Sequence, residues 1–440
     1  MTVQLRKFLF TPIDNAPIVL FRIIFGFLMF CEVTGAILLG WVRETFIEPK
    51  HHLPFIGFEW LNLPSAGLIY TYYILMGIAA LGIMFGAYYR FSTLAFAFLW
   101  WGSYLMQKVH YNNHYYLIIL LAFAMAVIPA NRYASWDVKR NPSLRGYTCP
   151  RWCSWFFILQ TGIVFTYASI AKIYPDWLAA KPISLWFAAK AHYPILGPLF
   201  KTGWFKYFIA YSGIIFDLAI TPLLLWRRTR MAAFILCIIF NLFNSIVFQI
   251  GGFPYLMITL TLFFFTPELI RKRFFRKKPA VDIATQTTYA YSNTVTAAFI
   301  LYFIIQIMLP LRHLVYPGNT LWTEEAHRMS WHMMLRTKTG SITFYGKIPE
   351  TGEQININLL EHFTLLQCRQ IAKQPDMAWQ AAQILKKIYT EKGYPTIALY
   401  AHTSVSLNGG PWKPMIDPET DLAQTPWNVF GHSPWILDYE

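Results

Sequence analysis

The amino-acid sequence predicts an α-helical polytopic membrane bundle of about nine transmembrane helices, followed by a small α+β extracytoplasmic domain. Hydrophobic residues make up 56% of the 440 residues and charged residues only 13%, whereas soluble domains carry roughly 25% charged residues. The mean hydropathy is +0.37, and the apolar residues gather in long runs that stop near residue 309. These observations exclude a soluble enzyme.

Nine apolar segments approach the length of about 20 residues that a membrane-spanning helix needs. They lie at residues 16–39, 67–88, 91–107, 114–129, 153–172, 205–226, 230–249, 253–268 and 291–309. Several hold only 16 or 17 residues, so eight spans is the alternative. The sequence therefore divides into a transmembrane bundle with the candidate site, residues 1–312, and an extracytoplasmic α+β domain, residues 313–440.

Positive charges in the short loops predict the orientation. Alternate loops, counted from the one that holds Arg6 and Lys7, are richer in Lys and Arg than the loops between them. Cytoplasmic loops carry such an excess, so we expect an integral membrane protein with a cytoplasmic N-terminus and, with nine spans, an extracytoplasmic C-terminus. The net charge of +15 then faces anionic lipid headgroups, and we expect no nucleic-acid partner.

After Leu309 the pattern changes and charges return. Alternating residues predict strands from Ser341 to Lys347 and from Gln354 to Leu359. Apolar residues at helical spacing predict a helix from Leu366 to Tyr389. Residues 406–440 are rich in Pro, Gly, Trp and Asp, which is typical of irregular structure packed by aromatic side chains.

Lys172 closes the fifth apolar segment and is the first functional candidate. A charged side chain at the bilayer centre costs on the order of 3 kcal/mol, so an ionisable residue within a span needs an explanation. A lysine that reaches the lipid headgroups would be structural. A buried lysine would instead be an uncharged amine that can act as a base.

His114 begins the fourth apolar segment and directly follows Asn112 and Asn113. A single histidine at this depth is most simply a structural hydrogen-bond donor. However, the count of spans places His114 on the same membrane side as Lys172, so two helices would bring an imidazole and an amine to one leaflet. This pairing favours a catalytic interpretation.

The seventh apolar segment supplies a group of polar residues, namely Asn241, Asn244, Ser245 and Gln249. Spacings of four residues put Asn241, Ser245 and Gln249 on one helical face. They indicate either hydrogen bonds between helices, which are common in membrane bundles, or one wall of a polar pocket. Three further residues within spans, Arg22, Glu32 and Asp217, are interpreted as structural partners in ion pairs or hydrogen bonds.

Metal and nucleotide chemistry has no support from motifs. The five cysteines are scattered, and the pair His51 and His52 lacks a third ligand at a diagnostic spacing. The sequence has no GxGxxG, Walker, HExxH or GxSxG motif between a strand and a helix. We therefore expect no metal.

Several segments together resemble the vitamin K-dependent gamma-glutamyl carboxylases, in a bacterial-type form with a shorter C-terminal region. They are NNHYYL at 112–117, ANRY at 130–133, AK at 171–172, DW at 176–177, FNLFNSIVFQIGGF at 240–253, SWHMM at 330–334, DP at 417–418 and SPW at 433–435. The similarity keeps the same order from about residue 15 to about residue 436 and so covers nearly the whole chain.

The resemblance implies a membrane enzyme that oxidises reduced vitamin K, as phylloquinone or menaquinone hydroquinone, with O2 to the epoxide and uses the energy to carboxylate glutamate with CO2. It implies Lys172 as the base that deprotonates the hydroquinone and His114 as an assistant at the glutamyl carbon or its carboxylation. The segment around Trp331 is implied in glutamate recognition. The residues expected to contact quinol or substrate are Asn113, Asn241, Asn244, Ser245, Gln249, His327, Trp331 and Arg336.

The chemistry agrees with this placement of the candidates. A glutamyl γ-proton is too weakly acidic for an ordinary side-chain base, so a stronger base has to be formed on site and protected from water. An apolar pocket in the outer leaflet would admit an isoprenoid quinol from the membrane lipid, while the C-terminal domain presents a glutamate-containing peptide or protein. We expect the host membrane to be a bacterial plasma membrane.

Two alternatives remain open on the sequence alone. One is a quinol epoxidase or oxidoreductase of the same fold that never carboxylates. The other is a non-enzymatic membrane scaffold. Retention of both Lys172 and the Trp331 segment favours the carboxylase.

Overall fold

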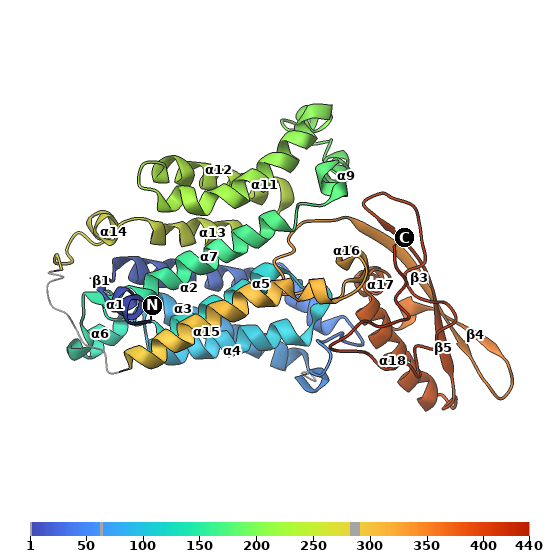
Figure 1. Cartoon of the computed structure of the whole chain (residues 1–440). Coiled ribbons are helices and arrows are strands. Elements are labelled where there is room, and N and C mark those ends of the chain that lie inside the picture. Colours follow the sequence, from blue (N-terminus) through green and yellow to red (C-terminus); the bar gives the residue numbers. More distant parts are fainter. Residues whose placement is uncertain (1, 62–64, 282–290, 440) are drawn as a thin grey trace.

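The computed structural model describes residues 2–61, 65–281 and 291–439. Figure 1 shows long helices that run side by side, with a separate unit of strands and helices at one end of the bundle. The N-terminus and the short helix α6 (Trp136–Arg140) lie at the opposite end. The architecture is thus a helical bundle followed by a small α+β region, as the sequence predicts.

Six helices in the described ranges are long and apolar enough to cross a membrane. They are α2 (Ala16–Leu38), α3 (Ala66–Phe85), α7 (Trp152–Ile170), α11 (Gly203–Leu225), α12 (Arg230–Phe248) and the run Ser292–Val315, which extends α15 (Ser292–Leu311) by a 3-10 turn. The helix α13 (Phe253–Leu260), its 3-10 extension (Thr261–Phe264) and α14 (Pro267–Phe274) form a pair bent by 115°. The count is seven if this pair is one span.

The predicted count of nine spans is not confirmed, although all nine segments are helical. The segment at 114–129 is α5 (Asn113–Val127), whose 15 residues extend about 22 Å, less than a hydrocarbon core of about 30 Å. The segment at 91–107 is α4 (Tyr89–Met106), which is not among the six. The segment at 253–268 breaks where Thr266 is extended before Pro267, because proline disfavours helical geometry in the residue before it.

Short elements connect the long helices. They are α1 (Thr2–Phe10), β1 (Pro12–Asp14), a π-helical turn (Arg43–Ile47), 3-10 turns at Glu59–Leu61, Lys108–His110 and Pro142–Leu144, β2 (Thr148–Pro150), α8 (Pro175–Leu178), α9 (Lys181–Ala189), α10 (Gly197–Phe200) and α16 (Thr320–Thr323). β1 and β2 pair antiparallel at the N-terminal end of the bundle.

The guanidinium of Arg22 is fully buried inside α2 and has a structural role. It donates hydrogen bonds to the backbone carbonyls of Ile83, Met84, Ala130 and Ala134. These carbonyls belong to the end of α3 and to the segment after α5, where helix termini leave carbonyl groups without partners. One side chain thus joins three parts of the bundle.

The C-terminal region contains a three-stranded antiparallel sheet in the order β4-β3-β5. Its elements are β3 (Lys338–Lys347), β4 (Gln354–Ile357), a 3-10 turn (Leu359–Glu361), α17 (Leu365–Ile371), α18 (Pro375–Glu391) and β5 (Ala398–Leu407). The two predicted strands are confirmed as β3 and β4. The single helix predicted from Leu366 to Tyr389 is in fact α17 and α18, separated before Pro375. A further strand that the sequence pattern does not predict, β5, pairs with β3 along ten residues.

The chain after β5 is irregular and packed by large side chains, as its composition predicts. Isolated bridges join Val405 to Lys413 and Ile416 to Ile436. Trp435 and Ile436 are buried in the core of the C-terminal region together with residues of α18. This segment is therefore part of the folded region.

Candidate active site

A cavity of about 450 Å³ lies where the bundle meets the C-terminal region. Its walls come from the segment 109–112 and from α5, α7, α8, α9, α11, α12 and α13. The C-terminal region adds the loop 327–336, α17 and Gln374. Seven of the predicted residues line it: Asn113, His114, Lys172, Asn241, Asn244, His327 and Arg336. Three predicted residues, Ser245, Gln249 and Trp331, are not among the lining residues.

Lys172 is held just after the end of α7 and is only 8% exposed. Its Nζ donates hydrogen bonds to Oδ2 of Asp217 at 2.6 Å and to the carbonyl of Ala168 at 2.9 Å. The ring of Trp177 lies 5.6 Å from Nζ. Lys172 is therefore buried at the cavity wall and does not extend to solvent, and its partner is the carboxylate of α11.

Asp217 has a larger part in the site than its sequence pattern predicts. The pattern indicates a structural partner, whereas the structure pairs Asp217 with the candidate base Lys172 itself. It also lines the cavity. An aspartate inside an apolar segment was a sufficient signal, because buried carboxylates in membranes are paired or functional.

His114 lies in the first turn of α5. The side chain of Asn112 accepts a hydrogen bond from the backbone N–H of Tyr115 at 2.8 Å, which caps the helix start. The imidazole lies between two rings, those of Tyr115 and Phe253, each with a centroid 5.2 Å away. Within the described ranges it has no hydrogen-bond partner, so both ring nitrogens are free for a bound molecule.

The seventh segment reaches the cavity with a different face from the one predicted. The lining residues on α12 include Asn241, Asn244 and Phe248. Ser245 shares a hydrogen bond with the hydroxyl of Tyr255 at 3.2 Å. Gln249 ends the helix in a left-handed conformation, with φ of 53°, so the helical spacing does not extend to it.

The loop before β3, residues 324–337, has a strained backbone and many hydrogen bonds. Five of its non-glycine residues have positive φ angles, Glu324, Ala326, Met329, Trp331 and Met334, and such residues persist only where the surroundings fix them. Trp331 is fully buried against Tyr116, with ring centroids 5.2 Å apart. It supports the loop from behind, which explains why it does not reach the cavity.

Glu324 is a buried centre of charge in this loop. Its carboxylate accepts hydrogen bonds from Arg336 and Lys338, and it lies 3.3 Å from Nδ1 of His327. Burial raises the pKa of Glu324, but the nearby Arg336, Lys338 and His327 lower it by a larger amount. The pKa of Glu324 therefore falls below its usual range. Arg336 thus reaches the cavity with part of its charge already paired.

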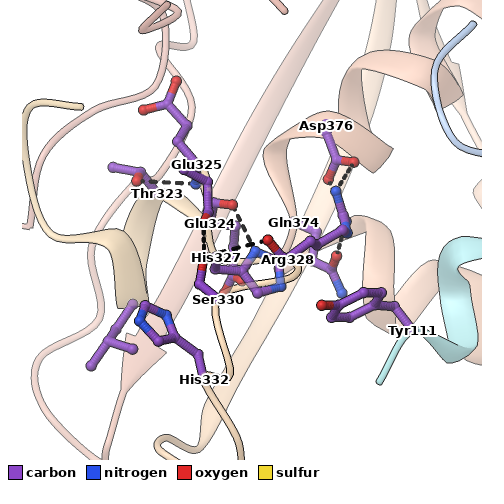
Figure 2. A network of polar contacts seen from close by, with 12 residues as sticks. Tyr111, Thr323, Glu324, Glu325, His327, Arg328, Ser330, His332, Gln374 and Asp376 are labelled. Carbon is purple, nitrogen blue, oxygen red and sulfur yellow. Dashed lines mark hydrogen bonds and ion pairs between the residues drawn. The ribbon is translucent and has the colours of Figure 1, made fainter. Parts of the chain in front are cut away.

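A second carboxylate joins the loop to the bundle. Asp376 at the start of α18 accepts a hydrogen bond from Lys108 at 2.5 Å and binds Arg328 at 2.8 and 3.2 Å. Figure 2 shows Arg328 between Asp376, Gln374 and the ring of Tyr111. Burial raises the pKa of Asp376, but Arg328 and Lys108 shift it well below its usual range.

Tyr111 and Asn113, which precede His114 in the chain, hold the loop at Met329 and His332. The hydroxyl of Tyr111 accepts a hydrogen bond from the backbone N–H of Met329 at 2.6 Å and donates to Oδ1 of Asn113 at 2.9 Å. The amide of Asn113 donates to the carbonyl of His332 at 2.9 Å. Both polar atoms of Asn113 are thus engaged, which favours a positioning role over the predicted contact with substrate.

The histidines of the loop are neutral at physiological pH. Burial lowers the pKa of His327 to about 4, although Glu324 raises it. Burial and the nearby His313 and His327 lower the pKa of His332 to about 3. Among the described residues, Nδ1 of His332 is buried without a hydrogen-bond partner, and this side chain lines the cavity. The sequence predicts the segment around Trp331 as part of the site, but not His332 itself.

No group of three or more His, Cys, Asp or Glu side chains that could hold a metal ion occurs in the part of the chain that the structure describes. The donors at the cavity are an amine, imidazoles, amides and a guanidinium, with Asp217 paired to the amine. This set of groups is suited to proton transfer and to binding a carboxylate.

Comparison with known proteins agrees with this division of the chain. Residues 10–269 match the HTTM domain family, and residues 291–440 match the lumenal domain of vitamin K-dependent gamma-carboxylase. No solved structure matches the chain. The apolar helices mark an integral membrane protein, and the second match marks its C-terminal region as lumenal or extracytoplasmic. The chain belongs to the vitamin K-dependent gamma-glutamyl carboxylase family.

Proposed function

We propose that this protein couples the oxygenation of an isoprenoid hydroquinone, reduced vitamin K or menaquinol, to the carboxylation of glutamate in a peptide or protein. The observation that carries the proposal is that one cavity is lined by the Lys172–Asp217 pair, His114 and His332, between the bundle and the C-terminal region. When bound, the hydroquinone would supply, through its oxygenation to the epoxide, the base and the free energy for removing a glutamyl γ-proton.

The cavity fits such a molecule. Its volume of about 450 Å³ lies within the range of cofactor sites, roughly 300–1,000 Å³. Phe165, Phe240, Phe253 and Met257 give it an apolar wall. Nδ1 of His332, which has no partner among the described residues, offers a buried polar contact. An aromatic ring with hydroxyl groups needs both kinds of surface.

Lys172 and Asp217 act together as the proton acceptor in this proposal. Burial alone is the reason for an uncharged amine that the sequence suggests, whereas the 2.6 Å contact between Lys172 and Asp217 would allow the amine to pass its proton to the carboxylate. The neutral amine can then accept a proton from a hydroquinone hydroxyl. Because the pair carries no net charge in either form, it avoids the cost of a lone charge in an apolar wall.

The glutamyl side is assigned to the imidazole of His114 and to the loop of the C-terminal region. Neutral His332 can accept or donate one hydrogen bond, and Arg336 presents the part of its guanidinium that Glu324 does not use. Asn241 donates its amide hydrogen to the carbonyl of Cys237, which leaves its oxygen as an acceptor. These groups would orient a carboxylate near His114.

The test uses purified protein with reduced vitamin K, O2, labelled CO2 and a small glutamyl peptide, and measures epoxide and fixed label separately. Lys172→Ala and Asp217→Asn are expected to abolish epoxide formation, and an added small amine should partly restore Lys172→Ala. Lys181→Ala is the matched control, because Lys181 forms an exposed pair with Asp176 at 2.7 Å.

Three results would change the proposal. Unchanged epoxide formation in Lys172→Ala would refute the assigned base. Epoxide without fixed label in the unmodified protein would show a quinol oxygenase that does not carboxylate. Absence of any turnover of reduced vitamin K or menaquinol would leave a scaffold function.

A further inference from the structure

Three arginines share a groove at the end of the bundle that is farthest from the C-terminal region. Arg90, Arg132 and Arg140 line this groove, whose volume is about 380 Å³. The groove lies at the start of α4, and the other end of α4 leads to Lys108, which binds Asp376 of the C-terminal region. Eighteen helical residues separate these ends by about 27 Å.

The frame of the groove is rigid because Asp137 is fully engaged with the backbone. Its carboxylate accepts hydrogen bonds from the N–H groups of Tyr88 and Tyr89 at 2.7 and 3.1 Å, and from the amide of Asn131 at 2.8 Å. These bonds hold Tyr88 in a left-handed conformation, with φ of 43°, which is rare for an aromatic residue. Asp137, the acidic residue among those that line the groove, thus binds backbone and amide N–H groups and none of the arginines.

The three arginines of the groove are exposed. None of Arg90, Arg132 and Arg140 forms an ion pair in the part of the chain that the structure describes. The guanidinium of Arg140 lies 4.2 Å from the ring centre of Tyr88. Three positive charges against one committed carboxylate leave the groove with an excess that attracts an anion, and arginine matches phosphate geometry well.

An apolar stripe on α4 begins at this groove. Phe91, Leu94, Phe98 and Trp101 are 75%, 41%, 55% and 39% exposed. Spacings of three and four residues place them on one face of the helix, which therefore faces lipid. A phospholipid could place its phosphate headgroup in the cationic groove and an acyl chain along the apolar stripe, whereas a free anion would occupy only the groove.

We propose that this groove binds the phosphate headgroup of an anionic glycerophospholipid, with an acyl chain along the exposed face of α4. The site is about 27 Å from the candidate active site end of the bundle and does not depend on the proposed reaction. It would fix a lipid to the frame that Asp137 and Arg22 hold together.

The test is native mass spectrometry of the full chain in mild detergent, titrated with dioleoyl phosphatidylglycerol, dioleoyl phosphatidylcholine or inorganic phosphate. The unmodified protein is expected to retain phosphatidylglycerol about tenfold better than phosphatidylcholine. The variant Arg90→Gln/Arg132→Gln/Arg140→Gln should lose most of this preference. A matched control, Arg227→Gln/Arg228→Gln/Lys272→Gln, removes the same charge from equally exposed positions that do not line the groove, and it should retain the preference. These positions lie in the turn between α11 and α12 and in α14, at the same end of the bundle (Figure 1).

Several results would overturn the proposal. Equal loss in both triple variants would show a diffuse effect of charge, and equal retention of both lipids would show that the arginines do not select an anion. Displacement of the lipid by inorganic phosphate at equal concentration would indicate a free-anion site. If the triple variant does not fold, the single variant Arg132→Gln carries the test, with at least a threefold loss expected.

Discussion

Asp376 is the counter-charge of two buried cations, Lys108 and Arg328. Loss of Asp376 should therefore destabilise the protein much more than loss of Lys108. Nζ of Lys108 and Nη1 of Arg328 lie 2.5 and 2.8 Å from the same oxygen of Asp376, so the two cations are at most about 5 Å apart. The side chains of Lys108 and Arg328 are 1% and 14% exposed. Replacement of Asp376 by Asn leaves both without a counter-charge.

The magnitude follows from this geometry. Two unit charges at about 5 Å repel by roughly 3 kcal/mol at an effective dielectric constant of about 20, and breaking a buried ion pair costs about 3–5 kcal/mol. Asp376→Asn should therefore lower the free energy of unfolding by about 3–5 kcal/mol. Lys108→Met should change it by only about 1 kcal/mol, because Arg328 and Asp376 remain as a balanced pair.

The pKa of Lys108 supports the small effect of its removal. Burial lowers this pKa to about 8, although Asp376 raises it, so the surroundings disfavour the charged form. Thermal unfolding in detergent measures both variants, and Asp376→Asn should lower Tm on the order of 10 °C. Glu391→Gln, at an exposed position at the end of α18, is the control. Equal losses in the two variants, or a shift in Asp376→Asn no larger than in the control, would refute the reasoning.

Three further predictions use other parts of the structure. Tyr111→Phe removes a hydroxyl with two hydrogen bonds, each worth about 1 kcal/mol; the ratio of fixed CO2 to epoxide should fall about tenfold while the fold is retained. Because burial lowers the pKa of His327 to about 4, the unfolded chain binds more protons than the folded protein between about pH 6.5 and 4. Tm should fall as the pH decreases through that range, and His327→Gln should reduce the slope. A Cβ at Gly26 would overlap the backbone of Met84, whereas one at Gly35 would meet nothing within 4 Å; Gly26→Ala should therefore lower Tm strongly and Gly35→Ala should not, since both lie in α2.

The apolar runs predicted the helices well because each run must satisfy its own backbone in lipid. What they could not predict is which helices cross. The helix α5 is too short to span the membrane, and a proline separates α13 from α14. Both facts depend on where the helices end, which the apolar runs do not specify. Pro375 was a visible signal for the break before α18. The strand β5 alternates buried and exposed residues over only part of its length, so its pattern was weak.

The sequence could predict most residues that line the candidate site, but it could not predict the ion pairs that these and the neighbouring residues form. Lys172 and His114 could be placed on one side by counting spans, and the structure brings both to one cavity. The pairing of Lys172 with Asp217 joins residues 45 positions apart, which no local pattern encodes. The contact of Lys108 with Asp376 spans 268 positions. It arises only when the C-terminal region docks on the bundle.

The helices α11 and α12 are sparsely covered by protein, with 28% and 22% of their apolar windows buried. Yet they provide Asp217, Asn241 and Asn244 to the cavity. Lipid therefore covers most of the apolar surface of these two helices, and their tilt depends on the thickness of the surrounding bilayer. Removal of lipid should therefore loosen the wall formed by α11 and α12, while the side that Asp376 joins to Lys108 and Arg328 keeps its shape.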